Sequence, residues 1–329
     1  MKLHKKTSFF TVLALFTLIV LAACGSTNEE ETNAEGTSAS DESSYTVEHA
    51  MGTTEISGTP EKVVILTNEG TEALLSMGVK PVGAVESWLG DPWYNHISED
   101  MQGVEVVGVE SEINLEKIAS LKPDLIIGNK MRQEDMYSKL SQIAPTVFSE
   151  TLRGDWQENF KLYAKALNRE DKGEEVLNDF DAHVEKVRKS LGDKVNQEIS
   201  VVRFMAGTTR IYWKDSFSGI ILEQIGFNRV EEQKKLFDED NKMGVFAVEV
   251  GKELIPEMDG DHIFHFTYAP DGDKEALATE EEWTTNPLWK KLSAVQEGNV
   301  KKVDDAIWNT AGGVIAANKM LEDIEEYFK

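Results

Sequence analysis

Cysteine occurs only once in the 329 residues, and basic residues are scarce, with 34 Lys+Arg against 59 Asp+Glu and a formal net charge of −25. A single cysteine excludes an internal disulfide, a thiolate zinc cage and an iron–sulfur cluster held by this chain alone, because each needs several sulfur atoms. The excess of negative charge argues against nucleic acid as a partner, since phosphate contacts need clustered Lys and Arg. Stability must come from apolar cores, and the length suffices for two ordinary domains.

The sequence also lacks the motifs of common enzymes and metal sites. It has no G-x-S-x-G, H-E-x-x-H or P-loop, and after residue 24 it has no thiol nucleophile. The histidines after residue 23 are dispersed, at His49, His96, His183, His262 and His265. The last two lie three apart on a predicted strand and therefore point to opposite faces. We expect no catalytic residues, no metal site and no cofactor; an extracytoplasmic enzyme and a zinc or manganese receptor remain the rival hypotheses.

The first 44 residues predict a targeting signal and a tether rather than a folded domain. Three lysines precede an uncharged apolar run at residues 9–23, which is typical of a signal peptide and shorter than the ~20 apolar residues of a transmembrane helix. The run ends in LAACG at residues 21–25, which resembles the lipobox of bacterial lipoproteins, whose cysteine is acylated and becomes the new amino terminus. We therefore expect a signal peptide at 1–23, lipidated Cys24, and an extracytoplasmic protein anchored to the cell membrane.

Residues 25–44 have no large apolar side chain and a surplus of acidic ones. Such a segment cannot bury enough surface to fold, so we expect a disordered tether over 24–44. By random-coil scaling it spans on the order of 25 Å.

From residue 45 onward, short apolar strands alternate with helical patterns, which predicts an α/β fold with parallel sheets. The predicted strands are 62–66, 81–85, 199–204, 262–266 and 300–303, and the predicted helices include 69–77, 217–225 and 313–327. Between the two groups of strands, apolar residues at three-to-four-residue steps predict one long amphipathic helix over 173–191. We expect a first lobe at 45–168, an interlobe helix at 169–192 and a second lobe at 193–329.

An internal repeat supports two related lobes. Residues 114–127 can be aligned with residues 252–264, so that Glu116 pairs with Glu253 and Asp124 with Asp261 at the same spacing of eight. Any helix-turn-strand unit shows such apolar periodicity, but the matching acidic residues favour a true repeat.

Aromatic and arginine residues gather at the carboxyl ends of the predicted strands, where open α/β sheets bind ligands. Individually each tryptophan is explained by core packing and each arginine by a surface ion pair; together, on loops of one face, they predict a pocket. Arg suits an anionic ligand because its planar fork meets carboxylate oxygens two at a time. The candidate ligand-binding residues are Trp88, Lys130, Arg132, Arg203, Arg210, Tyr212, Trp213, Trp308 and Asn309.

Several segments together resemble the iron-siderophore-binding lipoproteins of bacterial ABC importers, a branch of the periplasmic binding proteins. The segments are the lipobox, 60–66, 75–83, 114–124, 143–147, 216–219 with 222–227, and 307–318. The resemblance implies two Rossmann-like lobes joined by one long helix, the class III architecture, with the ligand in the cleft between them. It implies a monomeric, non-enzymatic receptor that captures a ferric siderophore and delivers it to an ABC permease.

The resemblance also implies finer assignments. One exposed Glu on each lobe meets the permease, and by motif position these are Glu116 and Glu253, with Glu249 as the competing choice. The arginine and aromatic set is similar to the hydroxamate or hydroxamate-citrate branch, which binds siderophores such as schizokinen; a catecholate siderophore, haem or cobalamin remains an alternative. Iron is then held by the siderophore, with no protein ligand.

Overall fold

The computed structural model describes residues 44–237 and 245–329. The predicted signal peptide, Cys24 and the predicted tether lie outside the described residues, apart from Ser44, which begins the first strand. Among the residues described, no helix is long and apolar enough to span a membrane.

The first sheet is parallel throughout, as predicted, with the strand order β5-β4-β3-β8-β9. Its strands are β3 (Val63–Ile65), β4 (Gly83–Ala84), β5 (Glu105–Val106), β8 (Leu125–Asn129) and β9 (Thr146–Ser149). Two small antiparallel pairs accompany it: β1 (Ser44–His49) with β2 (Gly52–Ser57), and β6 (Gly108–Val109) with β7 (Glu112–Ile113). The helices of this lobe are α1 (Asn68–Ser76), α2 (Leu115–Leu121), α3 (Lys130–Gln133), η1 (Glu134–Met136), α4 (Tyr137–Leu140), η2 (Arg153–Asp155) and α5 (Trp156–Ala166).

The second sheet is mixed, which corrects the expectation of a wholly parallel sheet. Its order is β13-β11-β10-β14-β15, with β12 also beside β10. The strands are β10 (Glu198–Met205), β11 (Thr208–Tyr212), β12 (Asn228–Arg229), β13 (Ala247–Glu249), β14 (His262–Thr267) and β15 (Val300–Lys302). Strand β11 folds back antiparallel on β10, because Gly207 takes the left-handed conformation that the tight turn requires, with φ of 65°. The helices are η3 (Gly192–Asn196), α7 (Phe217–Ile225), η4 (Glu231–Leu236), η5 (Lys252–Met258), η6 (Pro270–Gly272), α8 (Lys274–Thr284), η7 (Trp289–Lys291), α9 (Ser293–Glu297), the π-helical turn η8 (Ala306–Thr310) and α10 (Val314–Tyr327).

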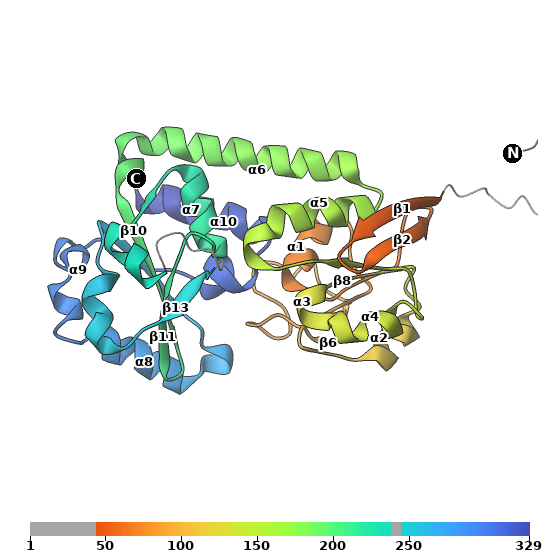
Figure 1. The fold of residues 1–329 in the computed structure, drawn as a ribbon, viewed down its shortest axis with the longest axis horizontal. Helices are drawn as coiled ribbons and strands as arrows, with labels where there is room; N and C mark the ends of the chain where they lie inside the picture. The colour runs from red at the N-terminus through yellow and green to blue at the C-terminus, as the bar shows by residue number, and fades with distance from the viewer. Residues whose placement is uncertain (1–43, 238–244) are drawn as a thin grey trace, which may run out of the picture. The chain divides into compact units, whose positions relative to one another are not determined.

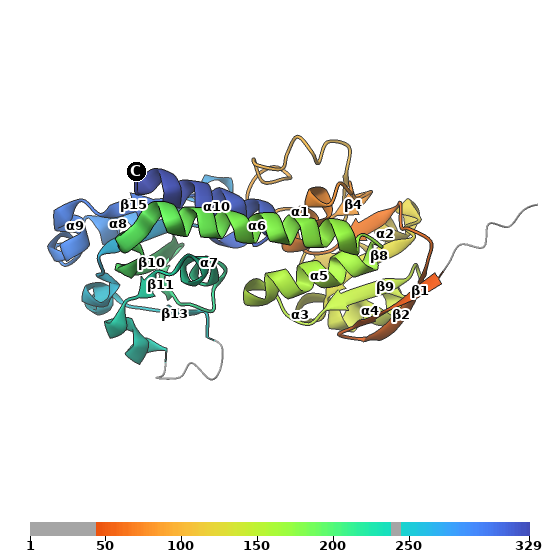
Figure 2. The same ribbon diagram turned by 90° about the horizontal axis from the view of Figure 1, so that it is seen from above.

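The predicted long helix is α6 (Glu170–Leu191), whose 22 residues span roughly 33 Å. Figures 1 and 2 show it running from the elements around the first sheet to those around the second. Its apolar stripe, including Leu177, Phe180 and Val187, is buried in a core that reaches both sheets. The class III architecture is therefore confirmed; the lobe limits at 168 and 192 stay a prediction.

A second element also joins the lobes. Helix α10 packs against α6 and α7 and also against α1 of the first lobe. Glu72 on α1, which is fully buried, accepts a hydrogen bond from the backbone N–H of Ala316 at 2.8 Å, near the amino terminus of α10. Its other carboxylate oxygen lies 2.5 Å from Nε2 of His96. A side-chain Cβ at Gly313 would lie 2.7 Å from Glu72, so only glycine allows this approach.

The internal repeat corresponds to equivalent positions in the two sheets. Asp124 precedes β8 and accepts hydrogen bonds from the backbone N–H groups of Glu61 and Lys62, just before the neighbouring strand β3. Asp261 precedes β14 and accepts one from the N–H of Glu198, at the start of the neighbouring strand β10. Each Asp thus fixes the beginning of the adjacent parallel strand, which gives the Asp of each repeat the same structural role.

Candidate functional site

A pocket of about 280 Å³ lies between residues of the two lobes. The first lobe contributes Glu69, Trp88, Glu110, Arg132 and Leu152; the second contributes Arg203, Met205, Arg210, Tyr212, Phe217, Phe246, Tyr268 and the run Asn309, Thr310, Ala311 and Gly312. Among the residues that the structure describes, the lining therefore combines three arginines, two glutamates and five aromatic side chains. Most ligand pockets are mainly apolar with a few placed polar groups, so three cations in one pocket point to an anionic ligand.

The hairpin of β10 and β11 places two of these arginines side by side. Arg203 and Arg210 are directly opposite each other in the antiparallel register. Side chains at such positions point to the same face of the sheet, and two like charges there repel each other. Tyr212, two residues beyond Arg210, shares that face.

Asp305 removes this repulsion by pairing with Arg203. The Nε and Nη2 groups of Arg203 donate to the two carboxylate oxygens of Asp305 at 2.7 and 3.0 Å, and Nη1 donates to the Tyr212 hydroxyl at 3.1 Å. The Tyr268 ring lies 4.8 Å from the guanidinium carbon. Burial lowers the pKa of Arg203, but the charge of Asp305 and the hydrogen bonds outweigh it, so the net shift is upward. Arg203 is therefore a rigid, permanently charged and already paired part of the wall.

Arg210 differs from Arg203 in its surroundings. It is half-buried in the pocket wall, and no hydrogen bond or ion pair joins it to any described residue. Glu249 on β13 is its opposite partner in the register, yet these two side chains form no ion pair within 4 Å. The guanidinium of Arg210 is thus available to a ligand.

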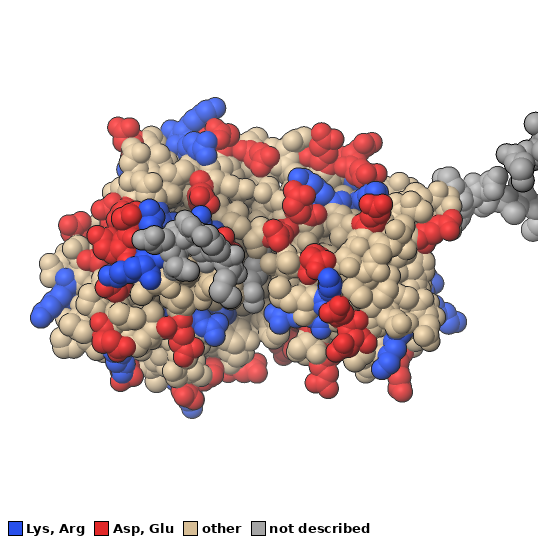
Figure 3. Space-filling model, in the orientation of Figure 1, with Lys and Arg blue, Asp and Glu red and all other residues tan. Residues whose placement is uncertain are grey.

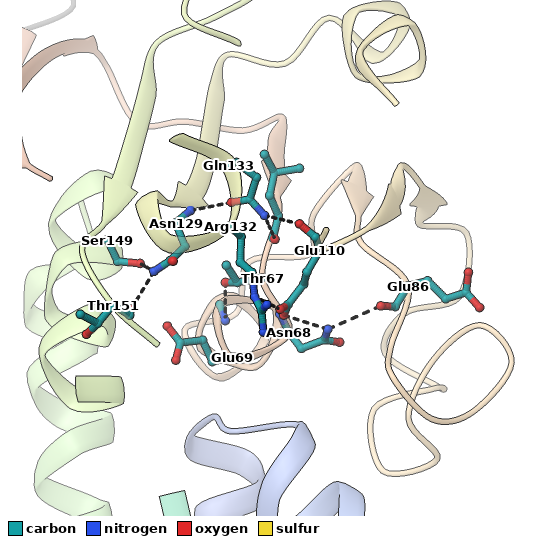
Figure 4. A network of polar contacts seen from close by, with 12 residues as sticks. Thr67, Asn68, Glu69, Glu86, Glu110, Asn129, Arg132, Gln133, Ser149 and Thr151 are labelled. Atoms are coloured by element: carbon teal, nitrogen blue, oxygen red, sulfur yellow. Dashed lines mark hydrogen bonds and ion pairs between the residues drawn. The ribbon is translucent and has the colours of Figure 1, made fainter. Parts of the chain in front are cut away.

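The opposite wall comes from the first lobe and is drawn in Figure 4. Arg132 extends from α3 toward Glu110, with Nε 3.5 Å from the carboxylate, and lies 5.9 Å from the Trp88 ring centre. The buried Glu110 also accepts hydrogen bonds from the backbone N–H and the side-chain amide of Asn68, at 2.8 and 3.0 Å. These bonds fix the carboxylate at the amino-terminal end of α1.

Glu69 is the second carboxylate in the lining. It accepts hydrogen bonds from the Asn159 amide at 2.6 Å and from the Tyr163 hydroxyl at 2.9 Å. Burial, together with the charge of Glu69, raises the pKa of Tyr163, which keeps that hydroxyl a donor. The carboxylate of Glu69 is therefore held by hydrogen bonds from two side chains of α5.

A scan of the chain against protein-family models identifies this arrangement. The model described as "Periplasmic binding protein" matches residues 63–307. The chain belongs to the periplasmic binding protein family. Proteins of this family bind ligands and are not enzymes, in keeping with the catalytic motifs that the sequence lacks.

Two curated relatives of this protein, and one solved structure of a similar protein, are informative. The "Probable siderophore-binding lipoprotein YfiY" of Bacillus subtilis is 52% identical over 329 residues, which cover 100% of this chain and 99% of that protein. The "Fe(3+)-citrate-binding protein YfmC" of the same organism is 30% identical, covering 98% and 96% of the two chains. The crystal structure of Staphylococcus aureus SirA complexed with staphyloferrin B has a TM-score of 0.78 and 39% identity, covering 86% of this chain and 98% of that one.

The structure of this periplasmic binding protein brings six of the nine candidate residues to the pocket. These are Trp88, Arg132, Arg203, Arg210, Tyr212 and Asn309. Whether they bind a ligand stays a prediction, but their common location agrees with the expectation of a shared face.

Three candidate residues lie elsewhere, each for a physical reason. Trp213 follows Tyr212 on the chain, so it points to the other face of the sheet, where it stacks on Phe237 at 4.8 Å. Trp308 is fully buried, stacks on Phe264 at 4.7 Å and donates from Nε1 to Asp323 at 2.9 Å. Lys130 pairs with Glu150 at 2.7 Å, outside the pocket lining.

Sequence reasoning missed several lining residues. Glu69 and Glu110 in the lining, and Asp305 behind Arg203, were not predicted because acidic residues are too common in this chain to stand out individually. Phe217 lies in the segment 216–219 that carries the family resemblance, but it was given no role there. Phe246 and Tyr268 gave no motif, although Tyr268 directly follows β14 at the ligand-binding edge of the sheet.

Glu116 and Glu253 occupy matching places, since each is the second residue of its helix and is exposed. Glu249 is also exposed, on the edge strand β13.

No group of three or more His, Cys, Asp or Glu side chains suited to a metal ion occurs within 44–237 and 245–329. His262 and His265 lie on opposite faces, against Tyr327 and Trp289 respectively.

Proposed function

We propose that this protein is a lipid-anchored receptor that captures a ferric siderophore and delivers it to an ABC permease. The observation that carries the proposal is the pocket between the lobes, where arginine guanidinium groups and aromatic rings line one cavity in a chain 52% identical to a protein named as siderophore-binding. Among siderophores, we propose the hydroxamate or mixed hydroxamate-citrate class, such as schizokinen.

The chemistry of the wall supports this class. Carboxylate and hydroxamate oxygens of a ferric complex can accept charge-assisted hydrogen bonds from Arg210 and from the remaining N–H groups of Arg203. The faces of Trp88 and Tyr268 offer apolar contact to the carbon framework of the ligand. One relative is named as an Fe(3+)-citrate-binding protein, and one structural neighbour was solved in complex with staphyloferrin B.

Tryptophan fluorescence provides the test, because Trp88 lies in the pocket lining. The purified protein is titrated with ferric hydroxamate-citrate, hydroxamate and catecholate siderophores, and with haem, cobalamin and zinc. Saturable quenching is expected with the hydroxamate-citrate complex. Preferential binding of haem, cobalamin or a catecholate would replace the proposed class, and binding of zinc alone would overturn the receptor proposal.

Arg210→Ala and Lys130→Ala form a matched pair of variants. Arg210→Ala should weaken binding at least tenfold, because a charge-assisted hydrogen bond contributes about 1.5–3 kcal/mol. Lys130→Ala also removes one positive charge, but it lies outside the lining and should leave affinity unchanged. Equal effects of the two changes would show that only the overall charge matters.

Delivery and anchoring are separate parts of the proposal. Replacing Glu116 and Glu253 together by Ala should abolish uptake in cells while ligand affinity stays normal, and the Glu249→Ala variant tests the competing position. Replacing Cys24 by Ser should release the protein from the membrane, which fractionation and mass spectrometry of the acylated amino terminus would detect. Normal uptake by the double variant would refute the docking assignment.

A further inference from the structure

Two of the three arginines in the pocket have a counter-charge supplied by the protein itself. Asp305 meets Arg203 through two hydrogen bonds, and Glu110 lies 3.5 Å from Arg132. Both carboxylates are buried, with exposed fractions of 4% each. Arg210 alone among the three has no such partner among the described side chains.

Both carboxylates are held in place independently of any ligand. The two hydrogen bonds from Arg203 hold the Asp305 carboxylate, and the Tyr212 hydroxyl in turn fixes the Arg203 guanidinium. Glu110 is fixed by the two hydrogen bonds from Asn68. A π-helical turn is rare, and here it leads directly into the lining residues 309–312.

We propose that Asp305 and Glu110 are specificity-determining residues, which act as built-in counter-anions and set the charge of the ferric complex that the pocket accepts. This inference rests on the proposed function. With Arg203 and Arg132 neutralised in place, Arg210 is the one uncompensated guanidinium among the described lining residues. Such a pocket favours a complex of low negative charge over a highly charged one.

Ferric siderophore complexes differ in their net charge. A complex in which two hydroxamates, one carboxylate and one alkoxide ligate Fe(III) carries a single negative charge, whereas a tris-catecholate complex carries three. A neutral tris-hydroxamate complex completes the series. The single charge of the hydroxamate-citrate type matches Arg210, the one available arginine in the described part of the lining.

The test compares Asp305→Asn with the unchanged protein against these three ferric complexes. Asparagine keeps the shape and one acceptor for Arg203 but removes the charge, and Tyr212 and Tyr268 still hold the guanidinium. The ratio of affinities should shift at least tenfold toward the trianionic complex relative to the neutral one, because charges a few ångströms apart in a partly buried site interact strongly. The shift should shrink at high salt.

Controls separate charge selection from structural damage. Asp323→Asn removes another partly buried carboxylate, which accepts from Trp308 outside the pocket, and should leave the ratio unchanged. Glu110→Gln should shift the ratio in the same direction as Asp305→Asn and gives an independent reading should the latter fold poorly. An equal loss of affinity for all three complexes, or an unchanged ratio, would overturn the inference.

Failure of the proposed function can be distinguished from failure of this inference about Asp305 and Glu110. If the unchanged protein binds none of the ferric complexes, the receptor proposal fails. Free citrate, a trianion that needs no iron, is therefore titrated against the same proteins, and tighter citrate binding by Asp305→Asn is the result that the inference requires. Equal citrate binding by both proteins would refute it.

Discussion

Replacing Glu72 by Ala should destabilise the protein by about 3 kcal/mol. The change removes a capping acceptor from α10, which contributes about 1 kcal/mol, and a hydrogen bond between His96 and a carboxylate, for which about 1.5–3 kcal/mol is usual. Both losses occur at a fully buried position, where water cannot readily replace the missing acceptor. Because Glu72 and Ala316 belong to different lobes, the whole cooperative unit should lose this stability.

Guanidinium chloride unfolding, followed by tryptophan fluorescence and circular dichroism, measures the effect. Glu72→Gln is the matched control, because its carboxamide can still accept from Ala316 and reach the His96 ring. We expect a loss of about 1 kcal/mol from the missing charge at the helix amino terminus. His96→Ala combined with Glu72→Ala should show a coupling of at least 0.5 kcal/mol. A Glu72→Ala variant within about 0.5 kcal/mol of the unchanged protein would refute the reasoning.

Three further predictions concern the same folded body. Burial lowers the pKa of His265 to about 4, so the histidine of the unfolded chain is protonated first as pH falls below 6.5. The free energy of unfolding should therefore be full above pH 6.5 and fall by roughly 3 kcal/mol toward pH 4. His265→Phe should flatten the dependence of this free energy on pH between about 6.5 and about 4. Gly313→Ala should cost about 1–3 kcal/mol by thermal unfolding, since the added methyl group meets Glu72 and the Glu69 backbone, and an unchanged melting temperature would contradict this close approach. Asp261→Ala should lower stability by about 1 kcal/mol through the lost bond to Glu198, and an unchanged denaturation midpoint would contradict the proposed equivalence with Asp124.

Much of the fold could be predicted from the sequence because local signals and tertiary packing agree. Helix α7 begins and ends where predicted, since Ser216 accepts a hydrogen bond from Gly219 at its amino terminus and Gly226 adopts the left-handed conformation after it. Helix α6 followed from one apolar stripe. Strand β11 was not among the predicted strands, because a glycine before a polar segment does not distinguish a long loop from a tight hairpin.

The pocket was only partly predictable for a similar reason. Arg203, Arg210 and Tyr212 were found because arginine and aromatic residues are conspicuous near the ends of predicted strands. Trp213 was grouped with them although its ring lies on the other face, because the register that fixes this face became visible only with β11 in place. Asp305 lies 102 positions from Arg203, and no local pattern indicates such a pair.

The docking of α10 on α1 has a consequence for the order of assembly. Glu72 and Ala316 are 244 positions apart, so the helix layer of the first lobe is completed by a segment that is synthesised long after it. The lining residues 309–312 immediately precede that segment. A growing chain therefore cannot finish its first lobe, or close the wall of its pocket, until α10 is available, and maturation of the fold and competence to hold a ligand arise in the same step.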